Sequence, residues 1–502
     1  MPRPITKVLV ANRGEIAVRI MRACRELGIQ SVAVYSEVDR LSAHVFEADE
    51  AYPIGPAPSS ESYLVADRII ETALRAGCDA VHPGYGFLAE RAFFAAAVTD
   101  AGLTFIGPSA AAINAMGDKT EARRRMIAAN VPVVPGNAEA LADAAAAEAV
   151  AEQFGYPVLL KAAAGGGGKG MRVVHERSEL ARAFAAATHE ATAAFGDGSV
   201  YLEKYLDRPR HIEIQVLADT HGNTLYLGER DCSVQRRHQK MIEEAPSPAI
   251  SPDVRARMGE AATAAARAVG YTNAGTIEFL FQDGEFFFLE MNTRIQVEHP
   301  VTELVTGLDL VQWQIRIAAG EPLPFAQSEI ELRGHAMECR ITSEDPANGF
   351  LPSTGHITEL SVPSGPGVRW DGGVLEGGEI SRFYDPLIGK LIVHAPDRAS
   401  AVARMQRALG ELRVSGVESS VPFHTAVLLE PDFRAGSFDI HYLEKHPAVL
   451  HPDVPEAMLR AAAIAAALLE DQRRQRGTPI RAHAAADTVP VRSDWRSRGW
   501  RR

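Results

Sequence analysis

The chain has 502 residues, of which 46% are hydrophobic and 23% are charged. This is an ordinary globular composition. The formal net charge of -12 at pH 7 argues against a general nucleic-acid or anionic-membrane surface. No stretch reaches the roughly 18 apolar residues of a membrane span. The four cysteines include no CxxC pair, so neither a zinc site nor a disulfide framework is expected. We expect a cytoplasmic protein of about two to four domains.

The first part of the chain alternates strand and helix patterns. A helical pattern at 15–28 ends in Gly28. Short apolar runs, read as buried strands, lie at 7–11, 31–36, 79–84 and 104–109. Such alternation predicts a parallel, doubly wound α/β sheet. The stretch Asn12-Arg13-Gly14-Glu15 follows the first strand, where a GxGxxG dinucleotide fingerprint would stand, so nothing indicates NAD.

The stretch "LLKAAAGGGGKGM" combines glycines with two lysines, Lys161 and Lys169. Glycines let the backbone approach a ligand closely and point its N–H groups toward it. We interpret the stretch as a loop over nucleotide phosphates rather than as a linker. It is not a Walker A loop, because GxxxxGK[ST] is absent.

A β-hairpin is predicted at 275–292, where Asp283-Gly284 separates two aromatic strands. Glu278 and Glu290 interrupt these apolar runs, which is costly unless a cation compensates. Oxygen ligands on adjacent strands suit Mg²⁺. A two-residue loop would send the two carboxylates to opposite faces. We therefore predict a three-residue loop closing on Gly284 with a bulge. The alternative is two carboxylates at a solvent-exposed edge.

Two stretches have a polar face, because alternate side chains of a strand share one face. The polar positions of "RHIEIQV" are His211, Glu213 and Gln215. Those of "EMNTRIQVEHP" are Glu290, Asn292, Arg294, Gln296 and Glu298. The stretch "ERDCSVQRRHQK" adds His238 and Lys240, and is either a solvated loop or a site for a small oxyanion. Together these stretches favour a polar cleft built on a sheet.

Together, the motifs make the chain resemble the biotin carboxylase component of the biotin-dependent carboxylases, within the ATP-grasp superfamily. The resemblance runs from about Lys7 to Lys445. Its motifs, in chain order, are "ANRGEIA", "HPGYGFLAE", "GPS" with "MGDK", "KAAAGGGGKGM", "EKYL", "PRHIEIQV", "ERDCSVQRRHQK", "EMNTRIQVEHPVTE", "GHAMECRI" and "YDPLIGKL". The departures from the family pattern, at Ala89, Ala164 and residues 418–420, remove no group that the chemistry needs.

The resemblance implies an α/β fold, α+β overall, in three parts. These are a Rossmann-like domain at 1–115, an ATP-grasp domain at 116–330 with a lid at about 134–205, and a mixed α+β domain at 335–447. Residues 448–502 form a tail with an Ala/Leu helix and a basic end containing Trp495 and Trp500. The tail is either a partner-docking segment or a frayed terminus.

The resemblance also implies site residues. ATP would bind Lys119, Lys161, Gly167, Gly168, Glu203, Lys204, Tyr205, Leu206, His211, Gln235, His238, Glu278 and Glu290. Two Mg²⁺ or Mn²⁺ ions would be held by Glu278, Glu290 and Asn292. Bicarbonate would bind Lys240, Arg294, Gln296 and the Val297 backbone, and biotin would bind Arg340 and Tyr85. Because the Val297 N–H must reach a ligand, regular strand should end near Asn292.

The implied reaction is the ATP-dependent carboxylation of biotin by bicarbonate through carboxyphosphate. The implied catalytic residues are Glu298 as general base, the cations Lys240 and Arg294, and Arg340 at the biotin enolate. The alternatives are another ATP-grasp ligase that forms carboxyphosphate, or a regulatory subunit that only binds ATP.

The chain contains no "AMKM"-type biotinyl-lysine motif. Biotin would therefore arrive on a separate carrier protein. A carboxyltransferase subunit would pass the carboxyl group to an acceptor that this sequence does not name, whether acetyl-CoA, propionyl-CoA, another acyl-CoA or pyruvate. The family implies a homodimer, and neither a nucleic acid nor a membrane is expected as a partner.

Overall fold

The structure is a computed structural model that describes residues 4–137, 140–162, 171–451 and 456–477. The chain divides into two compact units, Met1–His451 and Pro452–Arg502. In the second unit, helix α16 (Glu456–Gly477) confirms the predicted Ala/Leu helix. The basic end with its tryptophans lies outside the described residues. Within the described ranges, no helix is long and apolar enough to cross a membrane.

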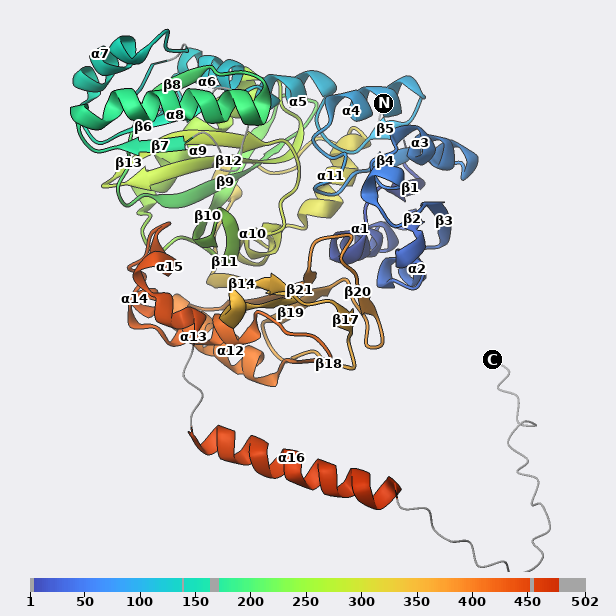
Figure 1. Ribbon diagram of the computed structural model, residues 1–502. Coiled ribbons are helices and arrows are strands. Elements are labelled where there is room, and N and C mark those ends of the chain that lie inside the picture. The colour runs from blue at the N-terminus through green and yellow to red at the C-terminus, as the bar shows by residue number, and fades with distance from the viewer. Residues whose placement is uncertain (1–3, 138–139, 163–170, 452–455, 478–502) are drawn as a thin grey trace, which may run out of the picture. The chain divides into compact units, whose positions relative to one another are not determined.

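The N-terminal sheet is parallel and has the strand order β3-β2-β1-β4-β5 (Figure 1, blue). Its strands are β1 (Lys7–Val10), β2 (Gln30–Ser36), β3 (Glu50–Gly55), β4 (Ala80–His82) and β5 (Thr104–Phe105). The helices of this part are α1 (Gly14–Glu26), α2 (Ala43–Glu47), α3 (Ala66–Arg75), α4 (Ala92–Asp100) and α5 (Ala110–Gly117). An order that reverses at the first strand is that of a doubly wound fold, so the predicted fold class is confirmed here.

A small antiparallel sheet, in the order β7-β6-β8, follows in the chain. Its strands are β6 (Val158–Ala162), β7 (Met171–Val174) and β8 (Val200–Lys204), and the helices of this region are α6 (Lys119–Ala128), α7 (Ala144–Phe154) and α8 (Arg177–Phe195). The predicted glycine loop falls between β6 and β7, outside the described residues.

The largest sheet is antiparallel and has the order β13-β12-β9-β10-β11-β14-β21-β19. Its strands are β9 (Arg210–Ala218), β10 (Thr224–Arg236), β11 (Gln239–Ala245), β12 (Asn273–Gln282), β13 (Glu285–Asn292), β14 (His335–Thr342), β19 (Val368–Gly372) and β21 (Leu387–Ala395). The helices that accompany it in the chain are α9 (Pro252–Ala268), α10 (His299–Thr306) and α11 (Leu310–Ala318). Because β11 pairs with β14, one sheet joins the central part of the chain to its C-terminal part.

The C-terminal part adds helices on one face of this sheet (Figure 1, orange). They are α12 (Arg398–Glu411), α13 (Val421–Leu429), α14 (Pro431–Ala435) and α15 (Tyr442–Lys445). Short strands complete it: β15 (Glu344–Asp345), β16 (Leu351–Pro352), β17 (Gly355–His356), β18 (Glu359–Ser361), β20 (Glu379–Ile380) and β22 (Arg413–Ser415). Short 3₁₀ turns lie at Glu37–Asp39, Ser59–Glu61, Gln327–Glu329, Pro346–Asn348 and Pro447–Leu450.

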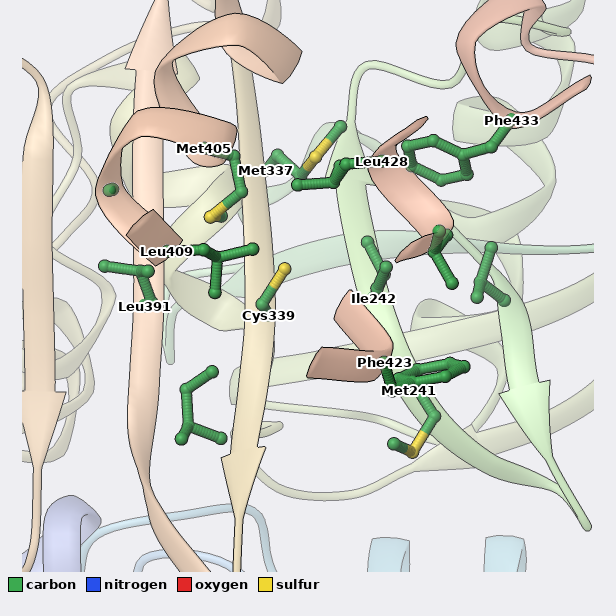
Figure 2. Close-up of a cluster of buried hydrophobic side chains, with 14 of the residues drawn as sticks. Met241, Ile242, Met337, Cys339, Leu391, Met405, Leu409, Phe423, Leu428 and Phe433 are labelled. Carbon is green, nitrogen blue, oxygen red and sulfur yellow. The ribbon is translucent and has the colours of Figure 1, made fainter. Parts of the chain in front are cut away.

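Strands β14 and β21 separate an apolar core from a polar face. Cys339 pairs with Leu391, and the next pair is Arg340 with Lys390. Since successive side chains point to opposite faces, Cys339 and Leu391 join the apolar cluster with Met405 of α12 (Figure 2). Arg340 and Lys390 therefore project from the other face of the sheet.

Candidate functional site

The turn of the β12–β13 hairpin differs from the prediction. Gln282 pairs with Glu285, so the loop has two residues, Asp283 and Gly284. Their φ angles are 52° and 85°, the positive values of a type I′ turn, whose twist matches that of the flanking strands. The predicted three-residue loop was wrong, because Asp-Gly strongly favours this shorter turn.

A bulge farther along the same hairpin brings the two carboxylates together. Phe279 pairs with Phe288, but Glu278 pairs with Glu290, which leaves Leu289 as the extra residue. One extra residue reverses the facing of every side chain beyond it. Glu278 and Glu290 consequently lie directly opposite each other on one face, as the prediction of a shared cation required.

The structure contains a cavity of about 860 Å³ whose wall includes this hairpin. It is lined by every predicted site residue whose side chain is described: Tyr85, Lys161, Glu203, Lys204, Tyr205, Leu206, His211, Gln235, His238, Lys240, Glu278, Glu290, Asn292, Arg294, Gln296, Val297, Glu298 and Arg340. Lys119 begins α6, but its side chain is not among those described, and Gly167 and Gly168 lie outside the described residues.

The stretch "ERDCSVQRRHQK" is not a solvated loop. Its residues up to Arg236 belong to β10, and its last two residues, Gln239 and Lys240, begin β11. Arg237 and His238 form the connecting turn, with positive φ angles of 48° and 68°. Strand β13 ends at Asn292, and residues 293–298 are irregular, which confirms the predicted end of the strand.

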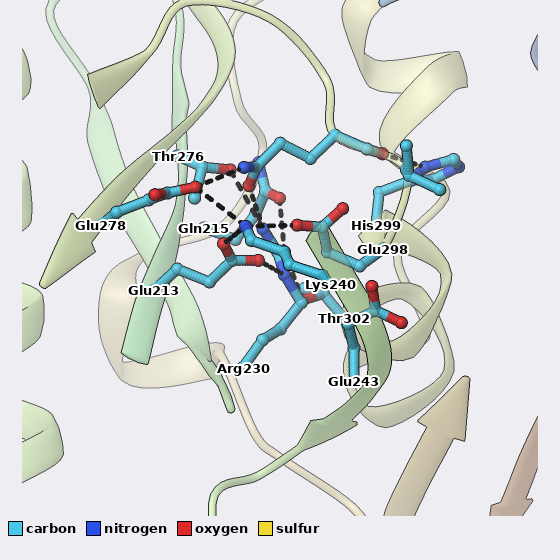
Figure 3. A network of polar contacts seen from close by, with 12 residues as sticks. Glu213, Gln215, Arg230, Lys240, Glu243, Thr276, Glu278, Glu298, His299 and Thr302 are labelled. Atoms are coloured by element: carbon cyan, nitrogen blue, oxygen red, sulfur yellow. Dashed lines mark hydrogen bonds and ion pairs between the residues drawn. The ribbon is translucent and has the colours of Figure 1, made fainter. Parts of the chain in front are cut away.

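Lys240 lies at the centre of a buried cluster of carboxylates (Figure 3). Its Nζ is 2.5 Å from Glu213 Oε2, 2.8 Å from Glu278 Oε1 and 2.6 Å from Glu298 Oε1. Burial alone would lower the pKa of Lys240, but the three carboxylates raise that pKa well above its ordinary value. Burial would likewise raise the pKa of Glu298, but Lys240 and Arg340 hold it well below its ordinary value. Glu298 is therefore a buried carboxylate that these two cations keep ionised.

Arg340 connects Glu298 to a second carboxylate that the sequence reasoning missed. Its Nη2 is 2.9 Å from Glu298 Oε2 and 2.6 Å from Glu243 Oε1. Burial raises the pKa of Glu243 to about 7, against the lowering effect of Arg340. The signal for Glu243 was a pair of adjacent carboxylates in the otherwise apolar second half of β11, "MIEEA".

The stability of the protein should depend on pH through Glu243. Its pKa is about 7 in the folded protein and ordinarily 4.5. Between these values the folded state binds the additional proton, so the contribution of Glu243 to stability falls as pH rises. The free energy of unfolding of Glu243→Gln, relative to the parent protein, should rise across this window by at most about 1.4 kcal/mol per pH unit. Denaturant titrations at several pH values measure this difference; a difference independent of pH would contradict the assignment.

Arg230 is fully buried beneath the cavity and was also missed. Its guanidinium donates hydrogen bonds to Glu213, Gln215, Thr276, Gln296 and Thr302 (Figure 3). Gln296 in turn donates to Glu278 Oε1 over 2.9 Å. Arg230 thus fixes the Gln296 amide and the Glu213 carboxylate from below. Arg230 lies in the quoted stretch "ERDCSVQRRHQK", but its role could not be read from that stretch because its partners come from strands and a helix elsewhere in the chain.

Removing this guanidinium should destabilise the fold strongly. Arg230→Met removes one of the two cations that contact the buried Glu213 carboxylate and leaves Lys240 as the other, and breaking a buried ion pair costs up to about 3–5 kcal/mol. Denaturant unfolding measures the effect. The control is Arg257→Met, since the Arg257 side chain is exposed and lies over the Phe286 ring; it should change stability by about 0.5 kcal/mol or less. Equal effects of the two substitutions would contradict the role given to Arg230.

At the other end of the cavity, Glu203 lies between two cations. Its carboxylate is 3.0 Å from Arg123 Nη1 and 2.9 Å from Lys161 Nζ. Lys204 donates to the carbonyl oxygens of Gly155 and Tyr156. Arg123 was not predicted, and its charged helix "KTEARRRMIA" offers no distinguishing signal.

The donor set facing the cavity fits a divalent cation. Glu278 and Glu290 are paired across β12 and β13, and Asn292 Nδ2 donates to Glu278 Oε1 over 2.9 Å. His211 Nε2 lies 3.0 Å from Glu278 Oε2. Burial would lower the pKa of His211, but Glu278 raises it. The two carboxylates are hard ligands of the kind that Mg²⁺ prefers, whereas the Asn292 amide oxygen accepts a hydrogen bond from Arg294.

Comparison with known proteins gives matches along most of the chain. Residues 4–113 match the family model of the biotin carboxylase N-terminal domain. Residues 118–326 match that of the carbamoyl-phosphate synthase L chain ATP-binding domain, and residues 338–445 match that of the biotin carboxylase C-terminal domain.

Individual relatives are similarly close. A pyruvate carboxylase subunit of Methanothermobacter thermautotrophicus is 54% identical over 441 residues, covering 88% of this chain and 90% of that protein. "Biotin carboxylase" of Haemophilus influenzae is 53% identical over 442 residues, covering 88% of this chain and 98% of that protein. The crystal structure of the biotin carboxylase domain dimer of Hydrogenobacter thermophilus 2-oxoglutarate carboxylase, in complex with MgADP, ADP and bicarbonate, is 50% identical. It superimposes with a TM-score of 0.84 and covers 90% of this chain and 99% of that chain.

Proposed function

Because this chain belongs to the biotin carboxylase family, we propose that it carboxylates biotin with bicarbonate at the expense of ATP. The observation that carries the proposal is the ionised Glu298 carboxylate, buried between Lys240 and Arg340 in one cavity. A related structure contains nucleotide, magnesium and bicarbonate together, which supports the same set of ligands here.

Lys119 and Lys161 would contact the phosphates of ATP, with Gly167 and Gly168 in the lid, and Glu203, Lys204 and Leu206 would frame the adenine. His211, Gln235 and His238 complete this side of the cavity. Glu278, Glu290 and Asn292 would hold two Mg²⁺ ions, or Mn²⁺ in their place. When bound, the metal supplies positive charge to the phosphate oxygens.

Bicarbonate would lie between Lys240, Arg294, Gln296 and the Val297 N–H. Its oxygen attacks the γ-phosphorus of ATP, and Glu298 takes the proton that this oxygen loses. The bond to the β-phosphate oxygen breaks, which yields carboxyphosphate and ADP. Lys240 and Arg294 stabilise the charge spread over the transferring phosphoryl group.

Biotin would bind against Arg340 and Tyr85. Carboxyphosphate separates into CO₂ and phosphate, and the phosphate removes the N1 proton of biotin. The Arg340 guanidinium stabilises the resulting enolate oxygen, and N1 then forms its bond to CO₂. The Tyr85 hydroxyl donates to Glu15, which fixes the ring at the cavity wall.

The carboxyl acceptor would be chosen by another protein of the complex. One relative, 54% identical, is a pyruvate carboxylase subunit, and another, 50% identical, is a methylcrotonoyl-CoA carboxylase subunit. Relatives with similar identity to this chain therefore belong to carboxylases with different acceptors. We propose that the partners are a separate biotin carrier protein and a carboxyltransferase subunit. We also propose a homodimer, which is the state of one related structure. The tail at 448–502 is a further candidate for partner docking.

An assay with free biotin distinguishes the proposal from its alternatives. ADP release should require bicarbonate and should increase when biotin is added. A different ATP-grasp ligase would release ADP without responding to biotin, and a regulatory subunit would bind ATP without cleaving it. Either result would overturn the proposed function.

A further inference from the structure

The loop that precedes Glu298 is irregular but held firmly. Gln296 and Glu298 are 3% and 2% exposed, although neither lies in a strand or helix. The Gln296 carbonyl oxygen lies 2.7 Å from His299 Nδ1. The next carbonyl oxygen, that of Val297, accepts a hydrogen bond of 2.6 Å from Lys390 Nζ. Two buried side chains therefore hold two successive peptide groups of this loop.

Lys390 is a fully buried ammonium group on β21. Its Nζ lies 3.2 Å from Glu15 Oε1 and 4.0 Å from Asp371 Oδ2. Burial would lower the pKa of Lys390, but Glu15, Glu338 and Asp371 raise it. A charged donor makes a stronger hydrogen bond to a carbonyl than a neutral donor does. Lys390 is also the neighbour of Arg340 across β14 and β21, so it enters from the biotin side of the cavity.

His299 supports the adjacent peptide group as a neutral ring. It is completely buried beside Glu298 (Figure 3). Burial, together with the nearby cations Lys390, Arg19 and Arg369, holds the pKa of His299 well below its ordinary value. Since a carbonyl oxygen only accepts hydrogen bonds, the proton of this neutral ring lies on Nδ1.

We propose that Lys390 and His299 are positioning residues for bicarbonate, a role that rests on the proposed function. The C=O and N–H groups of a planar trans peptide point in opposite directions. When His299 holds the Gln296 carbonyl, the Val297 N–H is turned the other way, toward the ligand. When Lys390 holds the Val297 carbonyl, the following residue, Glu298, keeps its carboxylate between Lys240 and Arg340.

The test compares two substitutions that remove one donor each. Lys390→Met and His299→Phe should each raise the KM for bicarbonate by roughly tenfold or more, while the KM for ATP stays within about twofold. The matched control is Arg398→Met, because Arg398 forms a partly buried ion pair with Glu244 and does not line the cavity. This variant should keep the parental KM values for bicarbonate and for ATP.

A double variant tests the role of Lys390 even if Lys390→Met alone does not fold. Lys390→Met leaves Glu15 without its cation, and adding Glu15→Gln removes that charge. The double variant should fold and keep the raised KM for bicarbonate. Folded variants with the parental KM for bicarbonate would overturn the positioning role. A parent protein without bicarbonate-dependent ATP cleavage would instead overturn the proposed function, so the two failures are distinguishable.

Discussion

Replacing Glu298 by glutamine is expected to slow bicarbonate-dependent ATP cleavage by roughly 10²- to 10⁴-fold, the usual contribution of a general base. The amide keeps the size of the side chain and its contact with Lys240, but it does not take up the bicarbonate proton. ATP affinity should change by less than about threefold, because the residues proposed for the nucleotide are untouched. Steady-state ADP release and a nucleotide titration measure the two effects.

Glu344→Gln is a suitable control for this experiment. Glu344 also lines the cavity, but it is given no part in the reaction, so its variant should keep the parental rate. If Glu298→Gln lost ATP binding together with turnover, or retained the parental rate, Glu298 would not be the base.

The second large effect is expected from Arg340→Met. Loss of the guanidinium should reduce biotin carboxylation by roughly 10²- to 10³-fold, as removal of an oxyanion donor does. The slow cleavage of ATP without biotin should fall far less, because Glu298 keeps its contact with Lys240. Parallel assays of labelled carboxybiotin and ADP separate the two activities.

The nearby Arg236→Met serves as the control for Arg340. Arg236 ends β10, with its guanidinium over the Phe350 ring of the C-terminal part, and it does not line the cavity. This variant should retain both activities. An equal loss of carboxybiotin and of biotin-independent ADP release in Arg340→Met would contradict the assignment of Arg340 to biotin.

The sequence predicted the features that local pattern determines. Strand and helix alternation predicts the parallel N-terminal sheet, and Asp283-Gly284 predicts the hairpin. The motifs placed 18 residues that line one cavity. A bulge was predicted at the Gly284 turn, but it lies at Leu289, and its place could not be predicted because register depends on the partner strand.

The groups that hold the site in place were not predicted, for a related reason. Arg230, Glu243 and Lys390 each find their partners in segments far away in the chain. A buried charge is recognisable only after folding shows what surrounds it. Arg230 and Lys390 stand within the quoted motifs "ERDCSVQRRHQK" and "YDPLIGKL", but only the folded structure shows which groups they contact.

The measurement that tests the central claim most directly follows oxygen from bicarbonate into phosphate. If a bicarbonate oxygen attacks the γ-phosphorus of ATP, then cleavage in the presence of ¹⁸O-labelled bicarbonate and biotin should place one labelled oxygen in each phosphate released. The reaction is stopped before the labelled bicarbonate exchanges its oxygen with water, and mass spectrometry of the phosphate then measures the label. Phosphate carrying oxygen only from water would contradict the account, because water rather than bicarbonate would then be the nucleophile.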